Sequence, residues 1–330
     1  MKKVKMGIIS FEHMHAMAYA QALMEAPQVE FVGITDDDAF RGTEMAAHFK
    51  TTYYPDYKDL LKEELDGVII CTCNKLHKDM TIAAAEAGAH ILVEKPFATN
   101  EEDAKAMLEV VERNKVQIMT AFPMRFHPAI LAAKEAVDRG ELGEILSITG
   151  INHGKIPSGW FLSRELAGGG AVMDHTVHLA DLMRWFTNSE YASVYCESGE
   201  LLHNKGIDDC GIVTVELDNG VFGTIDCSWG HHDNYTIWPE VYMEIVGTQG
   251  VLEVEAFKQI ARVFDVSANV VEDMVWGSNA DDGLVQEFIR VVQTGDIPKV
   301  TGMDGVRAME VALAAYRSTN SHKVEPVIHI

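Results

Sequence analysis

Residues 90–96 read His90-Ile91-Leu92-Val93-Glu94-Lys95-Pro96. The first four residues form a short apolar run, which is typical of a buried strand, and an ionisable pair follows directly. Pro96 disfavours a helical conformation at Lys95 and donates no backbone hydrogen bond, so Lys95 is expected to stay extended. Ligands bind beyond the carboxyl ends of the strands in parallel α/β sheets, which makes Glu94 and Lys95 candidates for a site. The alternative interpretation is an ordinary loop with a surface ion pair.

Strands and helices alternate on both sides of this stretch. Such alternation predicts a parallel sheet that is covered by helices on both faces. Thr99 and Glu102 fit a capping box at the start of one helix. We therefore predict a Rossmann-type dinucleotide-binding domain over residues 1–122. Strands are expected at 4–9, 29–34, 51–54, 68–72, 90–93 and 116–120, and helices at 15–25, 40–49, 56–64, 77–87 and 100–114.

The pattern changes after Phe122-Pro123, which is the expected domain boundary. Consecutive β-type runs parted by turn signals indicate an antiparallel sheet. Residues 123–330 are therefore predicted to form an α+β domain with a mainly antiparallel, open-faced sheet, which serves substrate binding and oligomerisation. Its expected elements are helices at 128–139, 170–186, 283–293 and 303–318, a strand at 144–152, and four or five strands between 191 and 254.

The composition and charge of the chain argue against two classes of binding partner. The chain has 330 residues, 47% of them hydrophobic, and a formal net charge of -23, so nucleic acid and anionic membranes would repel it. Small molecules remain as expected partners. The five cysteines are an odd number without metal-type spacing, which favours free thiols and a reducing cytoplasm. We expect neither a signal peptide nor a membrane span.

The first strand-to-helix turn departs from the dinucleotide fingerprint. Glycines are expected at three positions of G-x-G-x-x-G, but Ser10, Glu12 and His15 stand there. Asp36, at the end of the second strand, keeps the place of the acid that binds ribose hydroxyls, which favours NAD over NADP; a solvated charge run is the alternative. The residues of the turn that we expect beside the cofactor are Ser10, Phe11, His13 and Met14.

Two runs, 68–77 and 87–96, resemble the family of glucose-fructose and inositol oxidoreductases known as GFO/IDH/MocA. The order of elements is similar over nearly the whole chain. The resemblance implies that the lysine of Glu-Lys-Pro, Lys95, lies at the substrate. It also implies that Asn74 and His77 line the nicotinamide side of the cleft. The cofactor-binding residues expected on this basis are Thr72, Cys73, Asn74, His77, Glu94, Lys95 and Arg125.

A second family signature lies at 168–178, where three glycines precede Ala171-Val172-Met173-Asp174-His175-Thr176-Val177-His178. Asp174 and His178 are four residues apart, so they share one helix face. A lone histidine there is more often a core or surface residue. Together with the Glu-Lys-Pro motif, the pair indicates a catalytic site.

Alcohol oxidation requires these residue types. Hydride leaves a carbinol carbon readily only as the hydroxyl loses a proton, and histidine is a base of suitable pKa, so His178 is the candidate acid-base residue. Lys95 is expected to stabilise the developing alkoxide, and Asp174 to orient His178 or bind a neighbouring hydroxyl. Glu94 is expected to position Lys95.

Polar and aromatic side chains in loops of the second domain suit a polyhydroxylated ligand, while a polar loop that merely covers a sheet edge is the alternative. Asp174, His175 and His178, with His153, His231 and His232 elsewhere in the chain, could form a metal site with nitrogen and oxygen ligands. Adjacent helix positions diverge by about 100°, however, so Asp174 and His175 are not expected to share one metal with His178. We therefore expect no metal. The expected substrate-binding residues are Lys95, His153, Trp160, Asp174, His175, His178 and His231.

The leading hypothesis is an NAD-linked dehydrogenase or reductase acting on CH-OH groups of a sugar, inositol or related polyol. One alternative is an NAD-cycling glycosidase of the same family, which oxidises and re-reduces within one cycle. Another is a non-catalytic, Rossmann-shaped ligand sensor, which the missing glycines favour. An antiparallel sheet with one open face commonly pairs with another subunit, so a homo-oligomer, a dimer or tetramer, is also expected.

Overall fold

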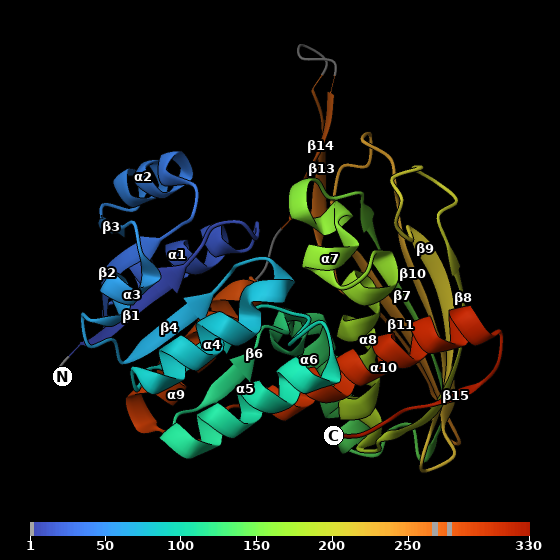
Figure 1. The fold of residues 1–330 in the computed structure, drawn as a ribbon. Coiled ribbons are helices and arrows are strands. Elements are labelled where there is room, and N and C mark those ends of the chain that lie inside the picture. The colour runs from blue at the N-terminus through green and yellow to red at the C-terminus, as the bar shows by residue number, and fades with distance from the viewer. Residues whose placement is uncertain (1–2, 266–269, 276–278) are drawn as a thin grey trace. The chain divides into compact units, whose positions relative to one another are not determined.

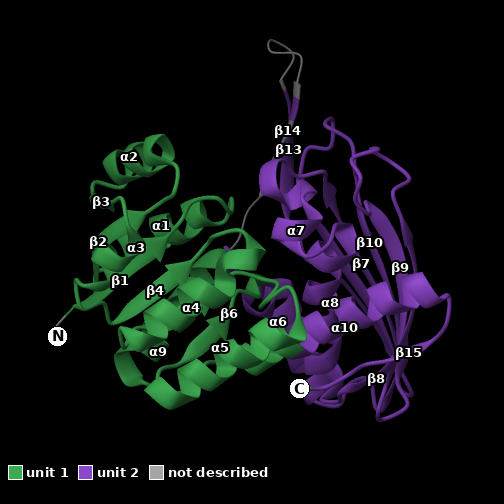
Figure 2. Cartoon of the chain, in the orientation of Figure 1, with its two compact units in different colours: residues 1–123, 281–306, 330 green, residues 124–280, 307–329 purple. Residues whose placement is uncertain are grey.

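The computed structural model describes residues 3–265, 270–275 and 279–330. The chain divides into two compact units, which Figure 2 colours separately. Unit 1 comprises Met1–Pro123, Asp281–Val306 and Ile330, and unit 2 comprises Met124–Ala280 and Arg307–His329. The units are therefore not two consecutive stretches, since a late segment of the chain returns to unit 1.

Unit 1 is built on a sheet in the order β3-β2-β1-β4-β5-β6, and its neighbouring strands are all parallel. The order reverses between β1 and β4, which is the switch point where ligands bind in doubly wound sheets. This confirms the predicted Rossmann-type sheet. The strands are β1 (Val4–Ile9), β2 (Val29–Thr35), β3 (Thr52–Tyr54), β4 (Gly67–Ile70), β5 (His90–Val93) and β6 (Ile118–Thr120).

Helices cover both faces of this sheet, which explains why its strands are continuous apolar runs. The Cα of Gly7 in β1 faces Leu60 and Leu65, whereas that of Gly67 in β4 faces Phe288 and Val292 of α9. Figure 1 shows α4 and α5 side by side on one face. The helices of unit 1 are α1 (Ala16–Glu25), α2 (Ala39–His48), α3 (Tyr57–Leu61), the 3-10 turn η1 (Asn74–Leu76), α4 (His77–Glu86), α5 (Glu101–Asn114) and α9 (Ala280–Thr294).

Several helix limits differ from the prediction, and two of these differences have a clear local cause. The N-cap of α5 is Asn100, whose side chain accepts the backbone N–H of Asp103 at 2.9 Å, so the capping pair lies one residue beyond Thr99 and Glu102. Helix α3 ends at Leu61 rather than at residue 64. Glu64 has a φ of +56°, which a continuing helix does not allow.

Unit 2 contains a sheet in the order β12-β11-β7-β10-β9-β8-β15. All its neighbouring pairs are antiparallel except β7 with β10, which confirms the mainly antiparallel sheet. Helix α8 packs on one face, against β7, β9 and β10. The strands are β7 (Ile145–Lys155), β8 (Tyr191–Gly199), β9 (Cys210–Leu217), β10 (Phe222–His231), β11 (Glu240–Gly247), β12 (Val251–Glu255) and β15 (Glu325–Pro326).

A separate hairpin of unit 2, β13 (Ile260–Asp265) with β14 (Val270–Val275), was not predicted from the sequence. The last long helix, α10 (Gly302–Ser321), begins in unit 1 and continues in unit 2. Every helix in the described ranges is too short or too polar to cross a bilayer. All five cysteines are free. The other helical segments are η2 (Pro123–Phe126), α6 (Pro128–Asp138), η3 (Gly159–Leu162), α7 (Arg164–Ala167) and α8 (Ala171–Thr187).

Candidate functional site

In the turn after β1, the first position of the glycine fingerprint keeps a glycine-type backbone conformation although a serine stands there. Ser10 has a φ of +72°, the left-handed conformation that normally favours glycine. Its hydroxyl accepts the backbone N–H of Glu12 at 3.1 Å, and its own N–H binds the carbonyl of Thr35 at 2.8 Å. The Glu12 carboxylate accepts the N–H of Cys73 at 2.8 Å, so it fastens this turn to the end of β4. Local hydrogen bonds thus hold the turn that glycine would otherwise permit.

The N-terminus of α1 suits a phosphate group. No side chain caps it and no acidic residue lies in its first turn. By contrast, Asp38 caps α2 and Asp56 caps α3. Helix N-termini carry unpaired N–H groups and a partial positive charge, so an uncapped end beside the switch point can take a pyrophosphate.

The Thr72 hydroxyl, at the carboxyl-terminal edge of the unit 1 sheet, is a second feature that suits a bound dinucleotide. The Thr72 hydroxyl, just beyond β4, is buried and has no hydrogen-bond partner within the described ranges. A buried hydroxyl without a partner costs free energy, so a ligand that bonds to it is favoured. Met14, in the β1–α1 turn, keeps 47% of its surface exposed. The residues present therefore fit the cofactor that the sequence predicts.

Asp36 is held by an arginine that the sequence reasoning missed. The carboxylate accepts the N–H of Phe11 at 2.7 Å and two hydrogen bonds from Arg41, at 2.6 and 2.9 Å. Burial raises the pKa of Asp36, but the bonds from Arg41 and from backbone N–H groups outweigh it, so the pKa is lowered. Asp36 is thus an anion at the end of β2. The sequence signal that could have indicated this ion pair is an aspartate followed by an arginine five residues later.

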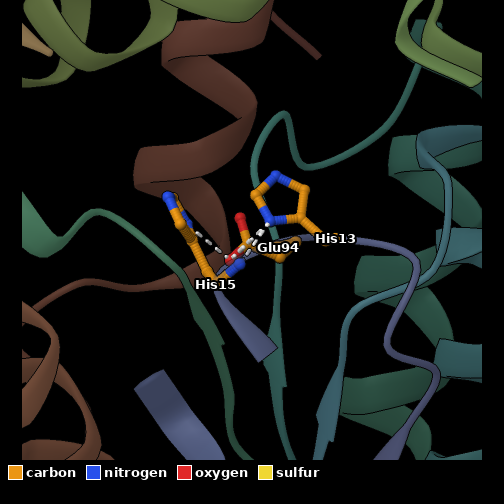
Figure 3. A group of neighbouring side chains, drawn as sticks. All are labelled: His13, His15 and Glu94. Atoms are coloured by element: carbon orange, nitrogen blue, oxygen red, sulfur yellow. Dashed lines mark hydrogen bonds and ion pairs between the residues drawn. The ribbon is translucent and has the colours of Figure 1, made fainter. Parts of the chain in front are cut away.

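Glu94, at the end of β5, is completely buried. Figure 3 shows its carboxylate between the imidazole rings of His13 and His15, whose Nδ1 atoms lie 3.6 and 3.1 Å from Oε1. The hydroxyl of Tyr19 donates to the same oxygen at 2.6 Å, and the backbone N–H of Lys95 donates to the other at 3.0 Å. Glu94 therefore fixes the main chain at Lys95, which is itself 5% exposed.

The ionisable groups of this cluster shift one another's pKa values. Burial raises the pKa of Glu94, but His13, His15 and Lys95 together lower it well below its usual range. Burial lowers the pKa of His15, but attraction to Glu94 and to Asp281 on α9 raises it overall. Burial and Glu94 raise the pKa of Tyr19, so its phenol stays a hydrogen-bond donor. The ligand-type atoms of the His13, His15 and Glu94 cluster also lie within 4.8 Å of one another.

His77 lies in the interior of unit 1. It is fully buried, and its ring nitrogens face the carbonyls of Pro96 at 3.0 Å and Thr72 at 3.3 Å. Burial lowers the pKa of His77, so the ring is neutral. It links the end of β4 to the Glu-Lys-Pro segment, whose Lys95–Pro96 peptide is cis. Asn74 and Cys73 are buried beside it in the sequence, at 5% and 3% exposed.

The glycines before α8 allow another loop to approach closely. A Cβ on Gly170 would lie 1.9 Å from the carbonyl oxygen of Asp208, and one on Gly169 would lie 2.1 Å from the hydroxyl of Tyr316. The Asp208 carboxylate accepts the N–H groups of Gly170 and Val172, at 3.1 and 3.0 Å. The glycine signature thus places Asp208 at the N-terminus of α8, where it satisfies helix N–H groups.

Asp174 and His178 share an accessible stripe of α8. They are half-buried, whereas the other residues from 171 to 183 are buried. The Asp174 carboxylate accepts the indole N–H of Trp229 at 3.0 Å and lies 3.3 Å from Nε2 of His175. Asp174 and His175 were predicted to point apart. Their Cβ atoms do lie on different sides of the helix, but the imidazole is long enough for its Nε2 to reach the Asp174 carboxylate, so the prediction is wrong for the polar ends of the two side chains. The other ring nitrogen of His175 faces the carbonyl of Asn152 at 2.9 Å.

Arg125 forms a buried ion pair. Its guanidinium donates to Asp181 of α8 at 2.7 and 2.5 Å, and the two side chains are 6% and 1% exposed. The guanidinium also lies 5.3 Å from the ring centre of Trp185. Arg125 was predicted to bind cofactor; the contacts described here join it to α8.

His153 and His231 do not lie with Asp174. Asn152 and Gly154 contact His175 on the α8 face, so His153, between them in β7, points to the opposite face. The sequence placed His153 in a loop after a strand ending at residue 152, but β7 continues to Lys155. His231 lies 6.0 Å from His153, ring centre to ring centre. Trp160, in η3, stacks on Phe161 at 3.8 Å.

Comparison with known proteins identifies both parts of the chain. Residues 4–122 match an oxidoreductase family described as having an NAD-binding Rossmann fold, and residues 130–253 match the GFO/IDH/MocA C-terminal domain. A scyllo-inositol 2-dehydrogenase (NAD(+)) of Bacillus subtilis is 30% identical over 277 residues, or 79% of this chain and 78% of that protein. A D-xylose 1-dehydrogenase (NADP(+)) of Haloferax volcanii is 28% identical over 314 residues, covering 90% and 92%. GenD2 from gentamicin A biosynthesis, solved in complex with NAD, has the same fold, with a TM-score of 0.92 at 22% identity over 100% of this chain and 97% of that one.

Proposed function

The chain belongs to the GFO/IDH/MocA oxidoreductase family, and on that premise we propose that it transfers hydride between a carbinol carbon of a sugar, inositol or related polyol and a nicotinamide cofactor. Relatives named as inositol and sugar dehydrogenases support the substrate class. The observation that carries the proposal is the edge of the unit 1 sheet, where the uncapped N-terminus of α1 and the buried Thr72 hydroxyl meet the demands of a dinucleotide.

Lys95 is proposed to bind the reacting hydroxyl oxygen. Its ammonium would lower the pKa of the alcohol and stabilise the developing alkoxide. Glu94 supports this role because it accepts the Lys95 backbone N–H at 3.0 Å and is itself fixed by Tyr19 and two histidines. The nicotinamide, when bound, supplies the atom that accepts or returns hydride.

His178 is proposed to take and return the hydroxyl proton, and Asp174 to bind or orient beside it. Their half-burial on one stripe of α8 supports this assignment, because a base must reach solvent or substrate to exchange its proton. Trp229 and His175 hold the Asp174 carboxylate, at 3.0 and 3.3 Å. Asp174 therefore has a fixed direction before substrate arrives.

NAD is proposed as the preferred cofactor. Asp36 is an anion at the end of β2, and an anion there binds ribose hydroxyls and repels a 2′-phosphate. Arg41 acts in the opposite direction, since an arginine at this place can accept a 2′-phosphate once it is released from Asp36. Asp36→Ala is accordingly expected to shift kcat/KM toward NADP.

The test is an assay of nicotinamide absorbance with a panel of inositols, aldoses and their glycosides, using NAD and NADP separately. A stoichiometric absorbance change with oxidised or reduced polyol supports the proposal. Product without a net absorbance change would instead indicate an NAD-cycling glycosidase. Binding of polyol with neither signal would indicate a ligand sensor and would contradict the proposed oxidoreductase.

Assembly and location are also proposed. Ile212 and Phe222, on neighbouring strands of the unit 2 sheet, are 47% and 60% exposed, which supports a homo-oligomer formed on that sheet. Light scattering that gives a monomer at all concentrations would contradict this. The free thiols support a cytoplasmic location, which cell fractionation can check.

A further inference from the structure

A cluster of histidines and carboxylates lies on the face of the unit 2 sheet opposite α8. Its members come from three neighbouring strands: His153 from β7, Asp226 and His231 from β10, and Glu240 from β11. His231 is 7% exposed, whereas the Glu240 side chain is 39% exposed, so solvent reaches one side of the cluster. These residues are distinct from Asp174 and His178, which lie on α8.

The hydrogen bonds of the two histidines fix which ring nitrogens carry lone pairs. Nε2 of His153 lies 2.9 Å from the Asp226 carboxylate, and Nδ1 of His231 lies 3.2 Å from the carbonyl of Trp238. Both oxygens can only accept, so these nitrogens are the donors. In neutral rings, Nδ1 of His153 and Nε2 of His231 therefore carry lone pairs. Such bonds to a carboxylate or a carbonyl are the usual support of metal-binding histidines.

Both of these lone pairs face one carboxylate oxygen. Oε2 of Glu240 lies 3.5 Å from Nδ1 of His153 and 3.5 Å from Nε2 of His231. One ligand-type atom from each of the three residues lies within 4.8 Å of the other two. Bonds of about 2.0–2.2 Å to a tetrahedral zinc ion would separate its ligands by about 3.4 Å. The two separations from Oε2 of Glu240 match that spacing and are long for direct hydrogen bonds.

The charge of the cluster calls for a cation. Three electron-rich atoms that converge repel one another unless a positive charge lies between them. Asp226 and Glu240 each carry a negative charge when ionised, and neutral imidazoles bring no positive charge to offset them. A divalent ion would balance the two carboxylates. Lys258 offsets part of the charge of Glu240, but its ammonium donates to Glu255 at 2.6 Å.

From this arrangement we propose that His153, His231 and Glu240 bind a divalent transition-metal ion, with zinc the best fit. Two histidines and one carboxylate form a known zinc ligand set, and three protein ligands leave a fourth position for water or another ligand. His231 and Glu240 also line a pocket of about 290 Å³, together with Tyr235, Tyr242 and Phe257. The ion would join β7, β10 and β11 at the loop between His231 and Glu240.

The first measurement uses the wild-type chain. A chelator first removes any metal from the untagged protein, which is then dialysed against buffer that contains zinc. Mass spectrometry measures the zinc that stays bound. One zinc per chain is expected, and X-ray absorption at the zinc edge should report two imidazole nitrogens and one carboxylate oxygen. Cobalt(II) should give the intense visible bands of a tetrahedral site. Less than stoichiometric metal, or a coordination shell without imidazole, would overturn the proposal.

Variants then assign the ligands. His231→Gln and Glu240→Gln should abolish stoichiometric binding, and Asp226→Ala should weaken it about 10–100-fold through loss of the support to His153. His232→Gln is the matched control, because His232 adjoins His231 but is exposed and outside the cluster. His15→Gln controls for the other cluster of ligand-type atoms. Stoichiometric zinc that persists in the two ligand variants, or is lost in His15→Gln, would refute the assignment.

Discussion

Glu94 is fully buried, and its carboxylate is approached by two histidines, a phenol and the backbone N–H of the next residue. The sequence predicted that Glu94 would position Lys95. The contacts with His13, His15 and Tyr19 could not be predicted, because these residues belong to another strand-to-helix unit and meet Glu94 only through sheet pairing. The physical role is positional: a fixed carboxylate fixes the main chain that carries Lys95.

The roles proposed for Lys95 and His178 can be tested by single substitutions. Lys95→Met removes the charge that stabilises the alkoxide and should lower kcat by about 10²–10³, and His178→Ala removes the base with a similar loss. The Kd for NAD(H) should change little, because the uncapped N-terminus of α1, Thr72 and Asp36 remain to hold the dinucleotide. Steady-state kinetics and NADH fluorescence titration check both values. Lys75→Met, at an exposed lysine in η1, is the control, and near-wild-type turnover in Lys95→Met would refute the role of Lys95.

The raised pKa of His15 predicts a pH-dependent contribution to stability. A group whose pKa is higher in the folded state stabilises fully below its unfolded pKa, about 6.5, and loses that effect as pH rises through the folded pKa. His15→Gln should therefore lower Tm more at about pH 5.5 than at about pH 9. Glu94 stays ionised across this range because its own pKa is lowered.

Thermal unfolding of the cofactor-free protein at the two pH values checks the prediction. His48→Gln, at an exposed position of α2, serves as the matched control and should show no such difference. An equal Tm deficit for His15→Gln at both pH values would show that His15 acts by packing alone.

At the scale of elements, local patterns predicted most of the strands and helices but not the β13–β14 hairpin, and contacts between elements decided where the side chains of the site lie. Strand β7 is an example: its alternating residues were predicted only to 152, so His153 was assigned to a substrate loop. The extra residues place His153 on the opposite face from α8. The reach of His175 toward Asp174 depends on side-chain rotamers, which helix periodicity alone does not specify.

The ion pair between Arg125 and Asp181 joins the segment before α6 to α8. Removing one partner of a buried pair leaves an uncompensated charge, so Asp181→Ala should lower the free energy of unfolding by about 3–5 kcal/mol. Arg139 and Glu135 form an exposed ion pair, with 3.7 Å between the nitrogen and the oxygen. Glu135→Ala should therefore lower the free energy of unfolding by only about 0–1 kcal/mol. Chemical denaturation measures both, and equal effects would contradict the structural role of the buried pair.

At the scale of the whole molecule, the sequence predicted an N-terminal parallel sheet and a C-terminal, mainly antiparallel one. It did not predict that residues 281–306 belong to unit 1. Phe288 and Val292 of α9 face Gly67 in β4, more than half the chain earlier. The amphipathic pattern of a helix indicates that it has a buried face but not which sheet covers it. Such pairings arise from packing rather than from local sequence.

The turn at Ser10, although it lacks the fingerprint glycines, is proposed to bind a dinucleotide beside Lys95. The most direct test of this binding is calorimetric titration of NAD and NADH into dialysed, untagged protein. One saturable site per chain is predicted, with NAD binding tighter than NADP and with the preference reduced in Asp36→Ala. Absence of saturable binding of either nucleotide would contradict the proposed dinucleotide site.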